Sequence, residues 1–303
     1  MNAQKHCDAV RYSTTSHYLA RHMKQPFVTA IVSTYNAERF IRGCLEDLTA
    51  QTLFSELEVL VIDSGSLQAE SAICSEYSIR YPQIKVIRTE REPLYAAWNR
   101  AIPLARGKYI TNANTDDRHR PDFMEVMAAA LEANADAALV YADQLVSHTE
   151  NETFKQCEER DARRRNWPDF TPVDLMLRCI TGSQPMWRKY LHDELGLFNT
   201  QYAIAADYDM WLRFAEKYRL LHLEEPLGVL FDSPSTMSGT NSRLNLNMEV
   251  LAIQSRCMTQ QKWRALPGMR KRLAAELFAR GINISSMTAI RALRSRFFER
   301  PSS

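Results

Sequence analysis

Two short apolar runs near the start of the chain decide the fold, PFVTAIVSTYN at residues 26–36 and LEVLVID at residues 57–63. The second run is almost continuously apolar, which is typical of a strand covered on both faces of a sheet. Between the runs lies an amphipathic stripe with helical spacing, formed by Phe40, Ile41, Cys44, Leu45 and Leu48. The order strand, helix, strand predicts a parallel unit with a crossover helix.

The same alternation continues along the first half of the chain. Helices are predicted over residues 69–81, 95–105 and 121–133, and strands over residues 84–89, 108–114 and 137–143. The fold class is therefore α/β, with a mostly parallel, Rossmann-like central sheet flanked by helices.

The second half is less regular. A polar stretch at 148–170 is expected to cross the surface, a helix is predicted over 208–218, and an apolar run (PLGVLF) ends at Phe231. From about Leu244 the periodicity is helical throughout. The predicted organisation is an extension (1–25), a main domain (26–232) with halves 26–145 and 146–232, and a basic helical region (233–303).

Composition excludes several classes of protein. The 303 residues are 45% hydrophobic and 24% charged, which is typical of a folded globular chain. No apolar run approaches the ~18 residues of a membrane-spanning helix, and the N-terminus has no apolar segment of a secretory signal. The six cysteines include no CxxC pair, so we expect reduced thiols and a cytoplasmic location.

Charge is concentrated near the end of the chain. Residues 256–300 contain eleven Lys or Arg and two Glu, a local charge of +9, whereas the whole chain carries +2 and its remainder therefore −7. The basic helices could contact an anionic membrane surface, dock a protein partner or form a solvated face. A nucleic-acid partner is not expected, because no base-reading module accompanies the charge.

Polar side chains follow three of the predicted strands. Thr34, Tyr35 and Asn36 end the first strand, Asp63 ends the second, and the run 114–117 (NTDD) follows the fourth. Ligands of open α/β sheets bind at the carboxyl ends of the strands. This edge could hold a nucleotide and a divalent metal ion.

Four segments together resemble glycosyltransferase family 2, the inverting enzymes with a GT-A fold. They are VTAIVSTYN, EVLVIDSGS, AAWNRAIPLARGKYITNANTDDRHRP and GSQPMWRKYLHDELGLFNTQYAIAADYDMWLRFAEKY, in that order. The resemblance covers about residues 26–232. It implies a GT-A sheet, a nucleotide-diphospho-sugar donor and a divalent metal ion.

The resemblance also implies roles for the strand ends. Thr34, Tyr35 and Asn36 match the motif that borders the base and ribose, and Asp63 matches the acid that accepts a hydrogen bond from the base, usually from the uracil ring NH. The alternative for Asp63 is a carboxylate that caps the loop before Gly65.

The metal motif of the family, Asp-x-Asp, falls on residues 114–116. Asn114 replaces the first acid, so it could contact the nucleotide instead, and Asp116 is the expected ligand of Mg²⁺ or Mn²⁺. Asp117 is assigned to the sugar side of the site. The alternative is that these acids cap the helix that begins near Pro121.

An inverting transfer needs a general base for the acceptor hydroxyl. The resemblance places it at Asp207, although Ala206 stands where the family has Glu. Asp209 is the other acid of this segment. Either residue could instead be a first-turn acid that complements the helix dipole.

Four further assignments complete the prediction. Asn99 would lie near the donor sugar, and Trp187 and Arg188 would line the acceptor side, the alternative being a core Trp with Arg on the rim. No His follows Leu230 where many family members have one, and His222 fits a packed core residue better than a ligand.

The preferred function is an inverting, metal-dependent transfer from a nucleotide-diphospho-sugar, most readily a UDP-sugar, to a glycan or lipid-linked acceptor. Such an enzyme would be cytoplasmic and could lie against the inner face of the membrane. A nucleotidyltransferase is disfavoured because STYNAER is not a phosphate loop. A non-catalytic nucleotide-sugar-binding subunit is the alternative, given Asn114 and Ala206.

Overall fold

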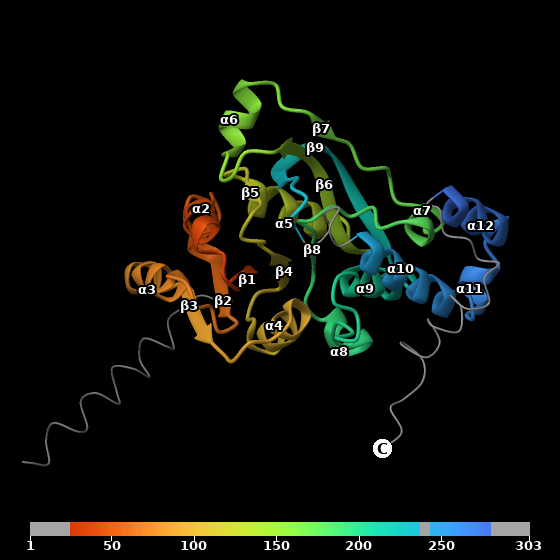
Figure 1. Cartoon of the computed structure of the whole chain (residues 1–303), viewed down its shortest axis with the longest axis horizontal. Coiled ribbons are helices and arrows are strands. Elements are labelled where there is room, and N and C mark those ends of the chain that lie inside the picture. The colour runs from red at the N-terminus through yellow and green to blue at the C-terminus, as the bar shows by residue number, and fades with distance from the viewer. Residues whose placement is uncertain (1–24, 237–242, 280–303) are drawn as a thin grey trace, which may run out of the picture.

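The central sheet is built around β1 (Val28–Thr34), which pairs in parallel with β2 (Leu57–Asp63) on one side and β4 (Tyr109–Asn112) on the other. β3 (Ile84–Arg88) extends the parallel part beyond β2. This computed structural model describes residues 25–236 and 243–279 (Figure 1). Across those residues the nine strands of the sheet follow the order β3-β2-β1-β4-β8-β6-β9-β5, and β7 pairs with β6.

The second half of the sheet mixes strand directions. β8 (Met186–Arg188) is antiparallel to both β4 and β6 (Ala137–Ser147), so β6 runs in the same direction as β4. β9 (Arg219–Phe231) is parallel to β6. The two-residue strands β5 (Arg118–His119) and β7 (Arg164–Arg165) are antiparallel to their neighbours. The long strands therefore end at one edge, which confirms the predicted mostly parallel sheet.

Helices cover both faces of this sheet. One face packs against α2 (Glu38–Thr49), α3 (Glu70–Arg80) and α5 (Phe123–Ala133). The other face packs against α4 (Leu94–Ala101), α7 (Pro172–Leu177), α8 (Leu191–Leu195) and α9 (Ala206–Ala215). Along β1, alternate residues join the two cores, Ala30 and Val32 the first and Ile31 the second, as the two-residue period of a strand requires.

Most predicted elements are present, and the differences are short. The buried face of α2 holds the five predicted apolar residues, and all seven residues of β2 are buried. The polar stretch at 148–170 contains α6 (Phe154–Glu159) and β7, and residues 102–104 and 54–56 form single 3₁₀ turns, η2 (Ile102–Leu104) and η1 (Phe54–Glu56). Strands of two or three residues are too short to show a period.

The C-terminal helices α10 (Arg243–Cys257), α11 (Gln261–Arg264) and α12 (Met269–Ala279) share the second core. Their buried residues include Ile253, Trp263 and Met269, which lie with α9 in one apolar cluster. In the part of the chain that the structure describes, no helix is long and apolar enough to cross a membrane. The extension 1–24 and the predicted stripe Met287, Ile290, Leu293 and Phe297 lie outside the described residues.

Candidate active site

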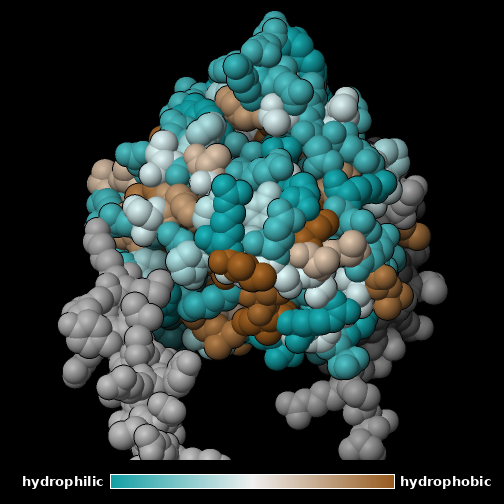
Figure 2. Space-filling model, turned by 90° about the vertical axis from the view of Figure 1, so that its left-hand side faces the viewer, coloured by the Kyte–Doolittle hydropathy of each residue, from teal (hydrophilic) through white to brown (hydrophobic). Residues whose placement is uncertain are grey.

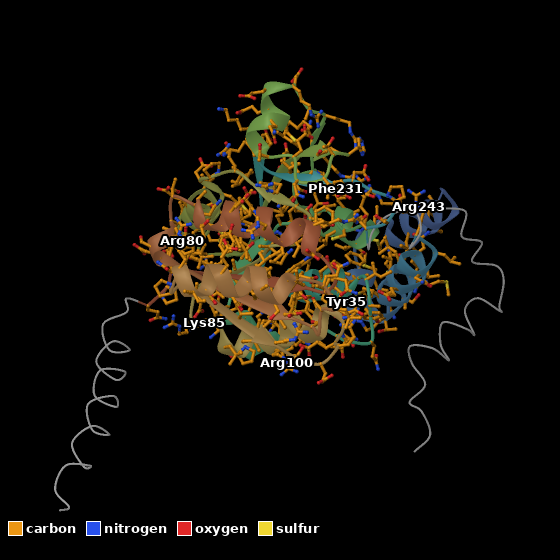
Figure 3. The ribbon with its side chains drawn as sticks, turned by 60° about the vertical axis from the view of Figure 1, so that its left-hand side comes forward. Tyr35, Arg80, Lys85, Arg100, Phe231 and Arg243 are labelled. Atoms are coloured by element: carbon orange, nitrogen blue, oxygen red, sulfur yellow. The ribbon has the colours of Figure 1, made fainter. Side chains whose placement is uncertain are left out.

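Strand register gathers the predicted residues at the carboxyl edge of the sheet. Thr34 pairs with Asp63, and Asp63 pairs with Arg88. On the other side, the amide of Ala113 donates to the carbonyl of Ile31, which carries the end of β4 beside β1. Figure 3 shows Tyr35 and Phe231 on the side of the sheet nearer the C-terminal helices, whereas Arg80 and Lys85 lie on the opposite side.

The turn after β1 is fastened to the turn after β2. Asn36 adopts a left-handed backbone with φ 51°, which Asn tolerates better than most residues. Its amide donates to Ser66 Oγ at 3.2 Å, and its side-chain oxygen accepts from the amide of Leu67 at 2.9 Å. Tyr35 is 39% exposed, and the guanidinium of Arg91 lies 3.8 Å from the centre of its ring. An aromatic and a cationic group therefore stand together at this edge.

Thr34 and Asp63 are buried beneath these turns. Thr34 Oγ1 is buried and has no hydrogen-bond partner within the described residues. Asp63 Oδ1 accepts from the amide of Ser66 at 2.8 Å, and Asp63 Oδ2 accepts from Arg88 at 2.6 Å. The loop-capping alternative for Asp63 is thus present in the structure. Its role toward a base stays a prediction, because a base would have to share or replace the Arg88 contact.

A polar network follows β4. Asn114 Nδ2 donates to Asp117 Oδ2 at 3.1 Å and to the carbonyl of Ser183 at 3.3 Å. Asp117 Oδ1 accepts from the amide of Phe231 at 3.1 Å, which ties the end of β9 to this edge. Burial and the charge of Asp116 raise the pKa of Asp117 to about 7. The carboxylate of Asp117 is therefore poorly solvated and lies within the electrostatic influence of Asp116.

The donor set fits a divalent cation that shares its ligands with a substrate. Within residues 25–236 and 243–279 no group of three His, Cys, Asp or Glu forms a complete metal cage. Mg²⁺ needs no such cage, because one or two carboxylates suffice when substrate phosphates and waters supply the other ligands. Both oxygens of Asp117 already accept hydrogen bonds, whereas Asp116 is partly exposed, so Asp116 is the more accessible candidate ligand.

Asp207 lies in the first turn of α9, against α4. Its Oδ1 accepts from the hydroxyl of Tyr95 at 3.0 Å and from the amide of Tyr208 at 2.7 Å. Burial raises the pKa of Asp207 to about 6. Tyr95 belongs to the first turn of α4, just beyond the carboxyl end of β3, so this contact brings Asp207 to the same edge as the strand ends.

Asp209 has a different environment. It is 2% exposed and is held by Arg213 at 3.1 Å and Arg256 at 2.6 Å. Its carboxylate therefore forms ion pairs with two guanidinium groups, which occupy both of its oxygens. Of the two acids in this segment, Asp207 is therefore the candidate base.

A short segment joins the two halves of the site. Burial and the nearby charge of Asp207 raise the pKa of the Cys179 thiol to about 12. Four residues later, the carbonyl of Ser183 accepts hydrogen bonds from Asn112 at 2.7 Å and from Asn114. Residues 179–183 therefore run from the neighbourhood of the candidate base to the network after β4.

The acceptor-side interpretation of Trp187 and Arg188 needs correction. Trp187 is fully buried, and Arg188 donates to three main-chain carbonyls, those of Leu131, Ala137 and Asn134, at 2.7 to 3.0 Å. Arg188 pairs with Tyr109 at the beginning of β4, which is the end of the strand remote from the site. Arg188 therefore fastens β8 to the end of α5, and Trp187 packs in the core on the other face of the sheet, beside Trp98 and Trp211.

Asn99 also has a structural role. Its amide nitrogen donates to the carbonyl of Phe198 at 2.8 Å, and its oxygen accepts from the amide of Phe198 at 2.9 Å. This pair of hydrogen bonds fastens the loop before α9 to α4. His222 is packed in the structure, between Asp143 at 2.9 Å and Asp169 at 3.0 Å.

Three residues of the site were not predicted from the sequence. Arg88 and Tyr95 could have been found, because each stands at the carboxyl end of β3 or in the first turn that follows it. Glu249 could not, because it lies on α10 and reaches residues 203–205 from another part of the chain.

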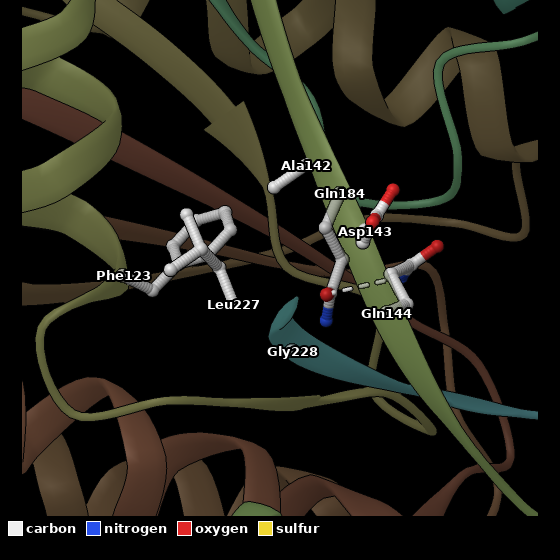
Figure 4. Close-up of a pocket in the computed structure, with 7 residues that line it drawn as sticks. All are labelled: Phe123, Ala142, Asp143, Gln144, Gln184, Leu227 and Gly228. Atoms are coloured by element: carbon white, nitrogen blue, oxygen red, sulfur yellow. Dashed lines mark hydrogen bonds between the residues drawn. The ribbon is translucent and has the colours of Figure 1, made fainter. Parts of the chain in front are cut away.

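A small space elsewhere in the molecule is part of the packing. It lies between α5, β6 and β9 and is lined by Phe123, Ala142, Asp143, Gln144, Gln184, Leu227 and Gly228 (Figure 4). The side chain of Gln184 covers Gly228 so closely that a Cβ there would lie 2.0 Å from Gln184 Oε1. Glycine at 228 therefore allows close packing.

The face of the molecule in Figure 2 is largely hydrophilic, with a small cluster of hydrophobic residues.

A mostly parallel sheet with amides and carboxylates at its carboxyl edge is typical of α/β proteins that bind their ligands at that edge. Residues 29–183, just over half of the chain, match the family model of Glycosyl transferase family 2. The chain belongs to glycosyltransferase family 2.

Two of the curated relatives are much longer than this chain. Chondroitin synthase of Escherichia coli is 26% identical over 200 residues, which are 66% of this chain and 28% of that protein. Hyaluronan synthase of Pasteurella multocida is 25% identical over 200 residues, which are 20% of its length. The chain thus spans less than a third of each of these two relatives.

Solved structures confirm the GT-A fold. TarS 1-349 of S. aureus in complex with UDP-GlcNAc superposes with a TM-score of 0.62 at 18% identity, covering 89% of this chain and 81% of that chain. Mannosyltransferase PcManGT of Pyrobaculum calidifontis, in complex with GDP-Man and Mn²⁺, gives a TM-score of 0.59 at 18% identity, covering 95% and 86%. At this identity the likeness shows the fold alone.

Proposed function

We propose that this chain transfers a sugar, with inversion, from a nucleotide-diphospho-sugar to an acceptor hydroxyl, and that Asp207 is the general base. The observation that carries the proposal is the placement of Asp207 at the same edge as the strand ends, with Oδ1 held by Tyr95 and Tyr208. Both hydrogen bonds end on Oδ1, so among the described residues Oδ2 is the oxygen that remains for a proton.

Its pKa supports this role. A general base works best when its pKa lies near the operating pH, since it must be ionised and still attract a proton. An ordinary aspartate is a weak base, whereas burial raises the pKa of Asp207 to about 6. Deprotonation of the acceptor hydroxyl by Asp207 would accompany attack on the anomeric carbon, and the nucleoside diphosphate would leave from the opposite face.

The donor would lie along the ends of β1, β2 and β4. Tyr35 and Asn36 would border the base and ribose, and Asp63 would accept a hydrogen bond from the base. A UDP-sugar is the preferred donor, because an ionised carboxylate suits the uracil ring NH. The TarS structures in complex with UDP and with UDP-GlcNAc are consistent with this choice.

A divalent cation would bind at Asp116 and share the diphosphate oxygens. When bound, it would neutralise charge on the leaving group. Asn114 supplies a neutral oxygen where a second acid would add charge, so we expect weaker binding of the free ion and tighter binding together with the nucleotide.

The acceptor proposed is a glycan or a lipid-linked intermediate. Two relatives are named as synthases of the polysaccharides chondroitin and hyaluronan, which supports a glycan acceptor. Basic residues on α11 and α12, including Arg264, Arg270 and Arg272, are exposed and would contact an anionic membrane surface or a protein partner on the cytoplasmic side.

Release of nucleoside diphosphate tests the donor. The protein is incubated with UDP-GlcNAc, UDP-glucose, UDP-glucuronate and GDP-mannose, each with Mn²⁺ or with EDTA, and proton NMR follows the anomeric configuration of the first product. We expect release of UDP that depends on Mn²⁺ and an inverted product. Retention of configuration would contradict the single-displacement mechanism.

A further inference from the structure

Glu249 of α10 is bonded to the segment that leads into α9. Its Oε1 accepts from the amide of Ala203, and its Oε2 accepts from the amides of Ile204 and Ala205, each at 2.9 Å. The residue is 6% exposed. A buried carboxylate that receives three main-chain N–H groups makes strong, charge-assisted hydrogen bonds and fixes the path of that backbone.

The beginning of α9, which follows this segment, has no side-chain cap at its N-cap residue, Ala205. Glu249 binds the amides of residues 203–205, the segment that leads up to α9, and of these only the amide of Ala205 is among the first amides of the helix, which need partners from outside it. Glu249 reaches the segment from α10, across 44 to 46 positions of the chain. The bonded segment ends two residues before Asp207.

The other side of the same segment is held by Tyr95. Its hydroxyl lies 2.8 Å from the carbonyl oxygen of Ile204 and 3.0 Å from Asp207 Oδ1. Residues 203–207 therefore lie between α4, which offers a hydroxyl, and α10, which offers a carboxylate. Removing either support frees the backbone that carries Asp207.

We propose that Glu249 is a positioning residue for Asp207, so that the C-terminal helix α10 forms part of the catalytic machinery. This inference rests on the proposed function of Asp207. Glu249 does not touch the reacting atoms. It holds residues 203–205 so that the carboxylate of Asp207 points at the acceptor hydroxyl, and its negative charge also makes Asp207 a stronger base.

The charge of Glu249 should affect the ionisation of Asp207, which a purely structural contact would not do. The titratable groups that face Asp207 are Tyr95 on α4, Cys179 in the loop after α7, and Glu249 on α10. Glu249 is the nearby group whose charge raises the pKa of Asp207, beside the larger effect of burial. Neutralising Glu249 should therefore move the ionisation of Asp207 to lower pH.

The test compares three variants, Glu249→Ala, Glu249→Gln and Val250→Ala, in the full chain. Val250 neighbours Glu249 on α10 and is 8% exposed in the same core, so its truncation controls for general loosening of the helix. The assay measures UDP release from UDP-GlcNAc against pH. Amide hydrogen exchange of residues 203–205 is measured on the same proteins without substrate.

For Glu249→Ala we expect kcat to fall about 100-fold, the cost of a misplacement of about 1 Å, while KM for the donor changes little. The kcat of Glu249→Gln should lie between those of the wild type and Glu249→Ala, and the acidic limb of its kcat profile should shift to lower pH. Exchange at 203–205 should speed up in both Glu249 variants. Val250→Ala should lower Tm but leave kcat, the acidic limb and this exchange unchanged.

Two results separate the inference from the proposed function. If Asp207→Asn is inactive while Glu249→Ala keeps wild-type kcat and slow exchange at 203–205, Glu249 positions nothing and the inference fails alone. If Asp207→Asn keeps full turnover, the base assignment fails whatever the Glu249 variants do. A loss of kcat in Val250→Ala as large as in Glu249→Ala would also overturn the inference.

Discussion

The hydroxyl of Tyr95 lies 3.0 Å from Oδ1 of Asp207, and this contact joins two segments that are 112 residues apart in the chain. The same hydroxyl lies 2.8 Å from the carbonyl oxygen of Ile204. A phenol has one hydrogen to donate, so the two acceptors compete for it. The position of Asp207 and its affinity for a proton thus depend on a residue at the carboxyl end of β3.

Replacing Tyr95 by Phe should make Asp207 easier to protonate. The hydrogen bond from Tyr95 lowers the pKa of Asp207 and so opposes the effect of burial. Without this hydrogen bond, the acidic limb of the pH profile of kcat should move to higher pH, which is opposite to the shift expected for Glu249→Gln. The measurement is UDP release from UDP-GlcNAc between pH 5 and 8. An unchanged limb in Tyr95→Phe would mean that Asp207 does not set it.

Asp207 should reduce the stability of the fold at neutral pH. Its pKa is raised from 3.8 to about 6, so the folded state binds a proton more tightly than the unfolded state does. This contribution to stability falls as pH rises between those values, and above pH 6 the buried charge costs stability. Asp207→Asn should therefore raise Tm by roughly 2 to 4 °C at pH 8 and by less at pH 4.5. Thermal unfolding across pH checks this, and an equal change at both values would contradict it.

The metal assignment predicts opposite effects of two substitutions. Asp116→Asn should abolish the part of UDP affinity that depends on Mn²⁺. Asn114→Asp should strengthen that part by adding a charge, but it also removes the hydrogen bonds to Asp117 and Ser183, so the protein without metal should be less stable. Calorimetry of UDP with Mn²⁺ or EDTA measures the first effect and thermal unfolding the second. UDP affinity that is indifferent to EDTA in all three proteins would refute Asp116 as a ligand.

Arg188 should matter for stability and not for the donor. Arg188→Ala removes the hydrogen bonds of Arg188 to three main-chain carbonyls, of which those of Leu131 and Asn134 keep a main-chain N–H donor, so the free energy of unfolding should fall by about 1 to 3 kcal/mol. Arg188→Lys should recover part of this loss. Denaturant unfolding measures both. A normal unfolding free energy together with weakened UDP binding would contradict the structural role of Arg188 and return it to the substrate site.

The residues at the strand ends could be predicted because the short apolar runs and the alternation of strand and helix patterns can be recognised locally in the sequence. Once the runs ending at Thr34 and Asp63 are recognised as parallel strands, their ends must meet at one edge. Trp187 and Arg188 misled the prediction because β8 has three residues, too few to show that it is buried between β4 and β6. The contact of Glu249 with residues 203–205 leaves no local pattern, since it depends on how α10 returns to the sheet.

The most direct test of the central claim is the turnover of Asp207→Asn, with Asp209→Asn as its control. Asp207→Asn keeps the size of the side chain but cannot take up a proton, and a positioned base contributes about 10² to 10⁴-fold in rate. Asp209→Asn removes charge from the ion pairs with Arg213 and Arg256.

With UDP-GlcNAc as donor, kcat of Asp207→Asn should fall by that factor while calorimetry finds wild-type UDP affinity. Asp209→Asn should unfold at lower temperature yet turn over normally at 20 °C. Normal turnover by Asp207→Asn beside an inactive, folded Asp209→Asn would contradict the account and move the base to Asp209.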